Sequence, residues 1–293
     1  MKINSTSIGY LNENFRFFHI KDQQNLEFDY HHHDFMKIVI LIEGDLTYFI
    51  EGKSYILKPW DILLINENEI HKPVINPSKV YERIVIWINP KFLQNIKNLG
   101  ADLSNCFTLS SQNKFNLIRL NMISLENIKN IINKIQSCDN DNEFASILLK
   151  DTLFIEFLIM INRCYIRSSN NNTSDDVIYD KLVDDILDFI NSNLTHNLSI
   201  DIIANKFFTS KYYLMRRFKA ITGSSIHNYI VQKRLILAKS LINEGFSMSD
   251  ACINSGFNDY SNFVRAFKKN YGVSPKHYFE NKNSVFSSEF YNE

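Results

Sequence analysis

The chain has few cysteines and no long uninterrupted apolar run, and these absences exclude several classes of protein. The four cysteines form no Cys-x-x-Cys pair, so neither a disulfide framework nor a cysteine zinc site is expected. The most apolar run, Leu153 to Ile161, contains Glu156 and is too short to span a bilayer. Met1 to Phe18 lacks the continuous apolar core of a signal peptide. We therefore expect a soluble, cytoplasmic protein with no membrane association.

The chain also lacks a net charge, but its charges are unevenly distributed. It contains 32 basic and 32 acidic residues, yet the segment from Thr195 to Lys282 has 13 Lys or Arg and only 5 Asp or Glu. The remainder has 19 basic and 27 acidic residues. A basic C-terminal block on an acidic remainder points to a polyanion as the partner of that block alone.

Two domains are expected from the length and from a polar segment within the chain. Residues 167–177 are rich in Ser, Asn and Asp and predict a flexible linker. Before it, short β-type runs bounded by turn clusters predict a small barrel or sandwich over 1–110, with helices over 111–166. The pattern beyond the linker is helical over 178–283, and a tail follows over 284–293. The predicted strands are Phe35–Ile42, Leu46–Ile50, Ser54–Leu57, Ile62–Ile65 and Val80–Ile88.

Two helical faces rich in Ile and Leu precede the linker. Such faces either pack on the barrel or form a self-association surface, and we expect a homodimer. The first face consists of Leu125, Ile128, Ile131, Ile132 and Ile135, and the second of Phe144, Ile147, Leu148, Ile155, Leu158 and Ile159.

A repeated motif near the C-terminus carries the functional argument. Residues 214–219 match residues 263–268 at an offset of 49, and the match continues at Gly223/Gly272 and Tyr229/Tyr278. Each copy has the pattern of a helix-turn-helix, which is a short first helix, a tight turn and a second helix with one apolar face. The predicted helices of this region are Tyr179–Asn191, Ile200–Phe207, a second helix capped by Thr209-Ser210, Ile226–Ile242, Met248–Asn254 and Tyr260–Tyr271.

The second helix of each unit is predicted to enter a major groove of DNA. An arginine in the middle of such a helix can reach a guanine edge, whereas flanking lysines suit phosphates. For both arginines the alternative is a phosphate contact or a surface ion pair. The predicted base-reading residues are Tyr212, Met215, Arg216, Tyr260, Ser261, Val264 and Arg265. The predicted phosphate contacts are Lys211, Arg217, Lys219, Lys268 and Lys269.

The second unit resembles the hallmark of AraC-type transcriptional regulators. The resemblance lies in Ser255-Gly256-Phe257-Asn258-Asp259-Tyr260, the Arg265-Ala266-Phe267-Lys268 that follows, and Gly272-Val273-Ser274-Pro275. It covers about the last third of the chain and implies two recognition helices in adjacent major grooves. It also implies promoter DNA as partner and activation through contact with RNA polymerase.

The β region resembles a cupin, the sensor domain of sugar-responsive members of that family. His31, His33, Lys37 and Gly44 follow the first cupin motif, and Gly52, Pro59-Trp60-Asp61 and His71 approximate the second. Lys37 stands where metal cupins place a glutamate, and a cation is unsuited to that position. No metal or other cofactor is therefore expected. By the period of two along a strand, His31, His33, Lys37, Val39 and Leu41 share one inward face. The resemblance implies a small-molecule effector, a carbohydrate, in the barrel. The expected ligand-binding residues are His31, His33, Lys37 and His71, which can hold hydroxyls or a carboxylate, with Trp60 stacked on a sugar ring; for Lys37 the alternative is an ion pair at the barrel rim.

The expected fold is a multi-domain α and β protein. A cupin-like β-barrel with two following helices precedes an all-α domain with two helix-turn-helix units. The expected function is that of a DNA-binding transcriptional activator, not an enzyme, controlled by the effector of the barrel. Two alternatives stay open, namely a DNA-binding dimer with no ligand and a metal-dependent cupin enzyme fused to a DNA-binding module. Metal analysis and thermal-shift screening with sugars would discriminate between them.

Overall fold

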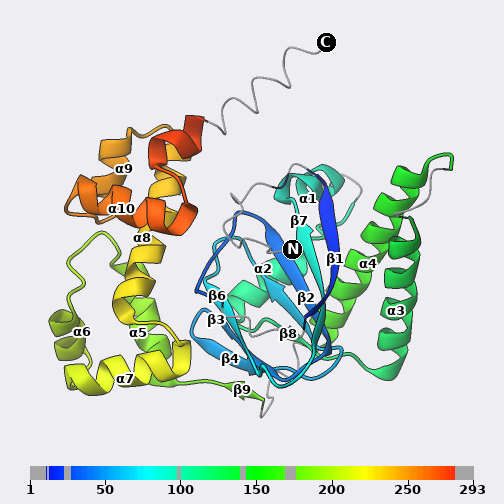
Figure 1. Cartoon of the computed structure of the whole chain (residues 1–293), viewed down its shortest axis with the longest axis horizontal. Helices are drawn as coiled ribbons and strands as arrows, with labels where there is room; N and C mark the ends of the chain where they lie inside the picture. Colours follow the sequence, from blue (N-terminus) through cyan, green and yellow to red (C-terminus); the bar gives the residue numbers. More distant parts are fainter. Residues whose placement is uncertain are drawn as a thin grey trace. The chain divides into compact units, whose positions relative to one another are not determined.

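The computed structural model describes residues 11, 13–22, 28–97, 100–138, 143–168 and 176–280. The chain divides into two compact units, and the main boundary falls between Ile178 and Tyr179. The first unit is built on β-strands with four helices, and the second consists mainly of the helical chain from Tyr179 onward (Figure 1). Residues 169–175 of the predicted linker and the predicted tail lie outside the described residues.

Two antiparallel sheets form the first unit. One has the strand order β1-β7-β2-β5-β8 and the other has the order β6-β3-β4-β9. Tight turns at Gly44 and at 51–52 join β2 to β3 and β3 to β4, as the turn clusters predicted. The strands are β1 Phe15–Asp22, β2 Met36–Glu43, β3 Leu46–Ile50, β4 Lys53–Ile56, β5 Ile62–Ile65, β6 His71–Ile75, β7 Tyr81–Ile88, β8 Leu117–Ile118 and β9 Val177–Ile178.

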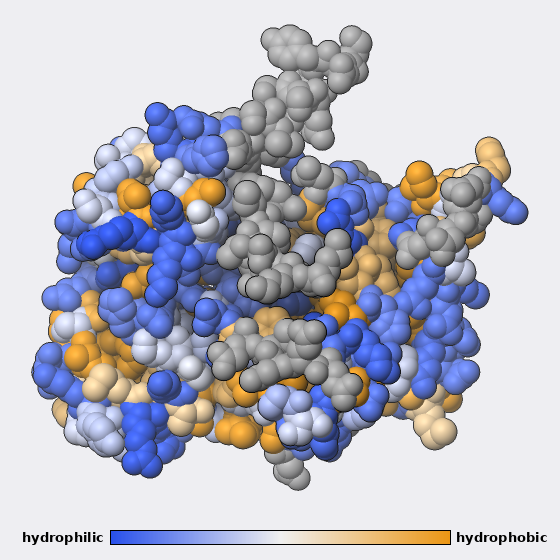
Figure 2. All heavy atoms as spheres, viewed as in Figure 1, coloured by the Kyte–Doolittle hydropathy of each residue, from blue (hydrophilic) through white to orange (hydrophobic). Residues whose placement is uncertain are grey.

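Four helices complete the first unit, and the longest two pack against each other. They are α1 Pro90–Ile96, α2 Asn105–Gln112, α3 Met122–Ser137 and α4 Ser146–Ser168. The predicted face of α3 is buried from Ile128 to Ile135, so it packs within this unit. The start of α4 differs, because Phe144, Ile147 and Leu148 are exposed to solvent. Hydrophobic surface gathers there, where α3 ends and α4 begins (Figure 2).

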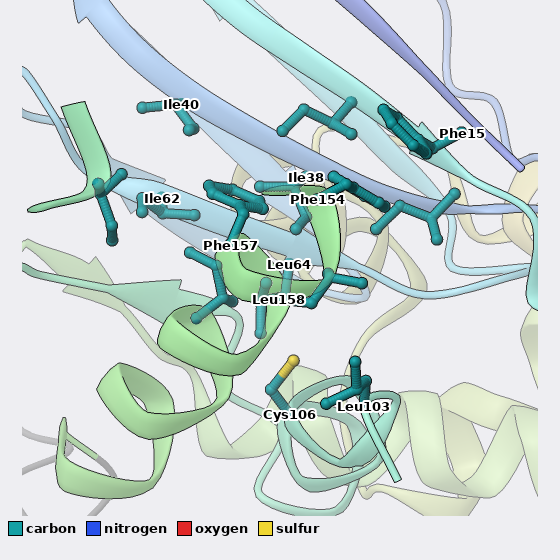
Figure 3. Packing of buried hydrophobic residues seen from close by; sticks show 14 of the residues in the cluster. Phe15, Ile38, Ile40, Ile62, Leu64, Leu103, Cys106, Phe154, Phe157 and Leu158 are labelled. Carbon is teal, nitrogen blue, oxygen red and sulfur yellow. The ribbon is translucent and has the colours of Figure 1, made fainter. Parts of the chain in front are cut away.

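The five-stranded sheet is buried on both faces, and the alternation of side chains along β2 divides them. Val39 and Leu41 belong to one buried cluster with Tyr48 of β3, which fills the space between the sheets. Ile38 and Ile40 belong to a second cluster with residues of α2, α3 and α4 (Figure 3). Because side chains of a strand alternate between faces, consecutive residues of β2 point in turn into the interior of the barrel and towards the helical layer.

The sequence missed four strands, β1, β6, β8 and β9, and all four lie at sheet edges. β1 takes in Phe15 to Phe18, for which the sequence predicted no strand, and pairs antiparallel with β7. β6 contains Pro73, and a proline within a short apolar run disfavours the prediction of a strand. Its edge position explains how a residue without a backbone N–H is tolerated there. The predicted linker is also shorter than expected, since α4 extends to Ser168 and Val177 begins β9.

The second unit contains two helix-turn-helix pairs joined by a long helix. α6 packs on α7, α9 packs on α10, and α8 contacts α7, α9 and α10 (Figure 1). The helices are α5 Lys181–Ser192, α6 Ile200–Lys206, α7 Lys211–Thr222, α8 Ile226–Asn243, α9 Met248–Asn254 and α10 Tyr260–Tyr271, and a short helical segment follows at 275–280.

The two helix-turn-helix pairs have the same helix lengths but differ by one residue in the length of their turns. The caps of the second helices, Ser210 and Asp259, are 49 residues apart, whereas the caps of the first helices, Ser199 and Ser247, are only 48 apart. Phe208 and Gly256 therefore hold equivalent places just after the first helix, and both have positive φ, at 51° and 91°. The second turn is longer by one residue before its recognition helix begins.

Candidate nucleic-acid interface and effector site

Helices α7 and α10 are built and capped in the same way. The Ser210 hydroxyl accepts a hydrogen bond from Tyr213 N at 3.3 Å, and Asp259 Oδ1 accepts one from Asn262 N at 2.8 Å. Gly223 and Gly272 end the helices in the left-handed conformation. Both helices thus present equal lengths of backbone from cap to stop.

The apolar face of each helix is fully buried, as the sequence predicted. Leu214 and Phe218 on α7 and Phe263 and Phe267 on α10 have no exposed surface. The opposite face of each helix remains open to solvent. A helix that buries one stripe and exposes a basic one suits insertion into a groove of DNA.

The predicted base-reading residues lie on these open faces. Arg216, Arg265 and Ser261 are exposed, Tyr212 is 72% exposed, and Val264 is half-buried. Arg216 has no hydrogen bond or ion pair within the described chain. Arg265 Nη2 donates to Asn262 Oδ1 at 2.5 Å, one turn earlier on the same helix. Met215 and Tyr260 complete the set at about half exposure. Base contact by these side chains stays a prediction.

The predicted phosphate contacts divide into two groups. Lys219, Lys268 and Lys269 are exposed and form no ion pair among the described residues. Lys211 instead pairs with Asp201 in the first turn of α6. Arg217 pairs with Asp180 at 2.6 Å, and the Asp180 carboxylate raises the pKa of the guanidinium. The structure therefore places Arg217 and Lys211 in contacts within the domain that the sequence did not reveal.

An Arg217→Ala variant is expected to lower the melting temperature of the helical unit by several degrees. Asp180 is buried and caps α5 through Val183 N at 3.1 Å, so losing the guanidinium leaves a buried carboxylate with fewer partners. Thermal unfolding by circular dichroism measures the change. Lys219→Ala is the matched control, because Lys219 has no such partner, and it should leave the melting temperature unchanged. An unchanged melting temperature for both variants, with a shallower salt dependence of DNA binding for Arg217→Ala, would favour the phosphate contact instead.

In the first unit, the structure brings four of the five predicted ligand-binding residues together. The ring centroid of His71 lies 4.3 Å from that of His31 and 4.8 Å from that of His33. Lys37 Nζ donates to Tyr48 Oη at 3.4 Å, and the Tyr48 ring stacks at 6.1 Å from the His71 ring. Tyr48 was missed in the sequence, although the alternation of Leu46, Tyr48 and Ile50 on β3 was a signal that it faces inward.

Trp60 does not join this cluster. It packs against the hydrophobic cluster of the helical layer, and Lys129 Nζ of α3 lies 4.4 Å from the centre of its ring. Trp60 also has a φ of 68°, in the left-handed region that favours glycine. The ring is thus on the opposite side of the five-stranded sheet from the histidines, and stacking on a ligand beside them is not open to it.

Burial changes the titration of the cluster. It lowers the pKa of Lys37 to about 7, with the charge of Arg83 adding to the effect. Burial also lowers the pKa of His31 to about 4, and the charge of Lys37 makes a smaller contribution in the same direction. Burial lowers the pKa values of His33 and His71 well below the ordinary value. The three imidazoles are therefore neutral at pH 7.

The stability of the first unit is expected to fall as the pH falls from 6.5 towards 4. The unfolded chain protonates these histidines near 6.5, whereas folded His31 does so near 4, so the unfolded state binds more protons in this window. Thermal unfolding at about pH 7 and about pH 5 measures the effect. His19→Gln, at an exposed histidine on β1, should retain the pH dependence, and His33→Phe should weaken it. A melting temperature that stays constant in the wild type would contradict the assignment.

Comparison with known proteins agrees with this division of the chain. Residues 16–158 match the AraC-like ligand binding domain, and residues 203–281 match a helix-turn-helix domain. The chain is 21% identical over 258 residues to the HTH-type transcriptional activator RhaS of Escherichia coli O157:H7, covering 85% of this chain and 87% of the relative. With both domains in this order, the chain belongs to the AraC-type transcriptional regulators.

Solved structures of two proteins give similar matches at low identity. ToxT from Vibrio cholerae in its unsaturated-fatty-acid-bound form is 20% identical, with 92% of this chain and 96% of that chain covered and a TM-score of 0.38. The DNA-binding domain of AdpA, in complex with a target DNA, is 19% identical, with 36% and 96% covered and a TM-score of 0.35. Among the described residues, no helix is both long and apolar enough to cross a membrane.

Proposed function

We propose that this chain activates transcription by binding a promoter site through α7 and α10, under the control of a small molecule bound in the first unit. The carrying observation is the pair of matched helices with buried apolar faces and exposed basic ones. Their arginines occupy equivalent positions, which suits two successive major grooves on one side of the duplex. RNA polymerase is the second macromolecular partner in this proposal, and RhaS supports activation as its sign.

The effector is proposed to be a carbohydrate held by the cluster around His71. Support comes from polar side chains gathered in the interior of a barrel, where buried polar groups without partners are costly. The domain match to an AraC-like ligand binding domain favours the same conclusion. A barrel that serves only to join two subunits has no need for this cluster.

The test is binding of the full-length protein to the DNA upstream of its own gene. A labelled upstream fragment and a random fragment of equal length are titrated at several salt concentrations, with and without sugars. Specific binding that a sugar alters, together with sugar-dependent transcription in a purified system, is the expected result. Equal affinity for both fragments at every salt concentration would overturn the proposal, because phosphate contacts alone give that behaviour.

A homodimer is proposed through the exposed apolar end of the α3–α4 hairpin. Ile147 is 79% exposed, and Phe144 and Leu148 lie beside it in the sequence (Figure 2). Exposed apolar patches of this kind mark association surfaces. Ile147→Glu is expected to convert dimer to monomer in sedimentation experiments, whereas Ile253→Glu, on an exposed apolar residue of α9, should not. A wild-type monomer at all concentrations would contradict this part of the proposal.

A further inference from the structure

The three clustered histidines of the first unit, His31, His33 and His71, share one tautomer. Nδ1 of His31 lies 2.9 Å from Asp29 O, Nδ1 of His33 lies 2.7 Å from Phe35 O, and Nδ1 of His71 lies 2.8 Å from Glu69 O. A backbone carbonyl only accepts hydrogen bonds, so each Nδ1 must carry the proton. A neutral imidazole has one N–H, and each Nε2 atom therefore presents a lone pair.

Two of these lone pairs are buried without a donor. Nε2 of His33 and Nε2 of His71 lie out of solvent and accept no hydrogen bond from the described residues. Buried polar atoms are satisfied in most proteins, and an exception calls for a partner from outside the chain. The two ring centroids lie only 4.8 Å apart, with the ring planes at 65°, so the two Nε2 atoms are near enough for one ligand to reach both.

A donor stands beside the two acceptors. Lys37 has only the long hydrogen bond to Tyr48 Oη, and no carboxylate among the described residues forms an ion pair with it. Its amine retains N–H groups whether it is charged or neutral. The cluster therefore combines two acceptors with one donor, and a hydroxyl group is the common ligand group that can both donate and accept.

We infer that the cluster binds a neutral polyol, with two hydroxyls donating to Nε2 of His33 and His71 and a hydroxyl oxygen accepting from Lys37. This rests on the proposed role of the first unit as the effector domain and narrows its ligand chemistry. A carboxylate has no proton for the two lone pairs and is repelled by them. A divalent ion suits lone pairs but not the adjacent Lys37, and the described residues contain no His, Cys, Asp and Glu group arranged to hold a metal.

The experiment measures thermal unfolding of the full-length protein with neutral aldopentoses and aldohexoses and with the uronic acids of the same hexoses. At least one neutral sugar should raise the melting temperature of the first unit, and its uronic acid should not, because only the native state binds. Larger shifts with uronic acids, or no shift with any sugar, would overturn the inference.

Variants separate ligand contact from folding. His33→Phe keeps the ring that stacks on Phe35 at 4.1 Å but removes Nε2, and it should weaken sugar binding by about tenfold or more. Lys37→Met is the second variant, for the case that His33→Phe does not fold, and it removes the donor without adding charge. His19→Phe, at an exposed position of β1, is the control and should bind sugar normally. Normal sugar binding by His33→Phe and Lys37→Met would overturn the assignment of these atoms.

Three further outcomes have distinct meanings. Stabilisation by Zn²⁺ or Ni²⁺ without sugar, lost in His33→Phe, would replace the polyol site by a metal site. Specific promoter binding with no sugar shift would overturn the polyol site and leave the proposed regulator standing. A sugar shift without specific promoter binding would do the reverse.

Discussion

A Gly256→Ala variant is expected to lose most of the stability of the second helix-turn-helix unit, and with it specific DNA binding. Gly256 has a φ of +91°, which costs a residue with a side chain about 1–2 kcal/mol. An added Cβ would also lie 2.2 Å from Leu194 O and 2.8 Å from Arg234 Nε. Because Arg234 Nε donates to that same carbonyl at 2.8 Å, the added methyl group would disrupt this hydrogen bond. Crowding adds about 1–3 kcal/mol.

The expected loss, about 2–5 kcal/mol, is a large share of the stability of a domain. Circular dichroism should show the melting temperature of the helical unit falling by roughly 10 °C or more. Gly272→Ala is the matched control, because Gly272 has a similar φ of +78° but nothing within 4 Å of an added Cβ. Equal losses in the two variants would show that the φ angle alone matters and that the contact with Leu194 does not.

Substitution at Phe208, the position equivalent to Gly256 in the first helix-turn-helix, should change stability in the opposite direction. Phe208 has a φ of +51° and is 96% exposed, so its ring contributes little packing. Phe208→Gly should therefore raise the free energy of unfolding by about 1 kcal/mol, since glycine adopts this conformation without strain. A lower melting temperature in this variant would mean that the exposed ring has a stabilising contact in the native state.

Replacing Arg216 or Arg265 by alanine is expected to weaken binding to the specific site by about 1–3 kcal/mol and to relax preference at one base pair each. Both side chains are exposed near the middle of their helices, where a guanidinium reaches a guanine edge. Arg265 is also oriented by Asn262, so Asn262→Ala should reproduce part of its loss. Titration against a set of sites with single base-pair changes measures both effects.

Lys268→Ala provides the control for this series. Lys268 is exposed in the last turn of α10, and its loss should weaken binding to all sequences alike and make the salt dependence shallower. Equal losses on specific and random DNA for the arginine and lysine variants would remove the base-reading assignment. A loss of preference at one base pair in each arginine variant, with no such loss in Lys268→Ala, would support the base-reading assignment.

The helical domain could be predicted closely because its boundaries are set by local signals. The ranges Met248–Asn254 and Tyr260–Tyr271 agree with the structure, since Ser247, Asp259 and Gly272 mark caps and stops that operate within one turn. Strand β1 carries no such mark. Its partner β7 lies far along the chain, and only that pairing makes Phe15–Asp22 a strand.

The candidate sites show the same limit. The alternation along β2 correctly predicted that Lys37 shares a face with Val39 and Leu41, since Lys37 donates to Tyr48 of the same cluster. Side-chain direction in a strand is local information. The pairing of Arg217 with Asp180 joins two helices, and the separation of Trp60 from His71 depends on which face of a sheet each loop reaches. Neither relation can be predicted from the spacing of residues along the chain.

The extra residue in the second turn has a consequence for engineering. Ser210–Gly223 and Asp259–Gly272 have equal length and the same type of cap and stop, so these segments can be exchanged as cassettes to reprogramme the DNA sequence that is recognised. Exchanging the whole units from Ser199 or Ser247 onward would also transfer the turn, which is one residue longer in the second helix-turn-helix, so the change would not be confined to the recognition helix. The two helix-turn-helix units are therefore not interchangeable as wholes, and a chimaera should be joined at the cap of the second helix, Ser210 or Asp259.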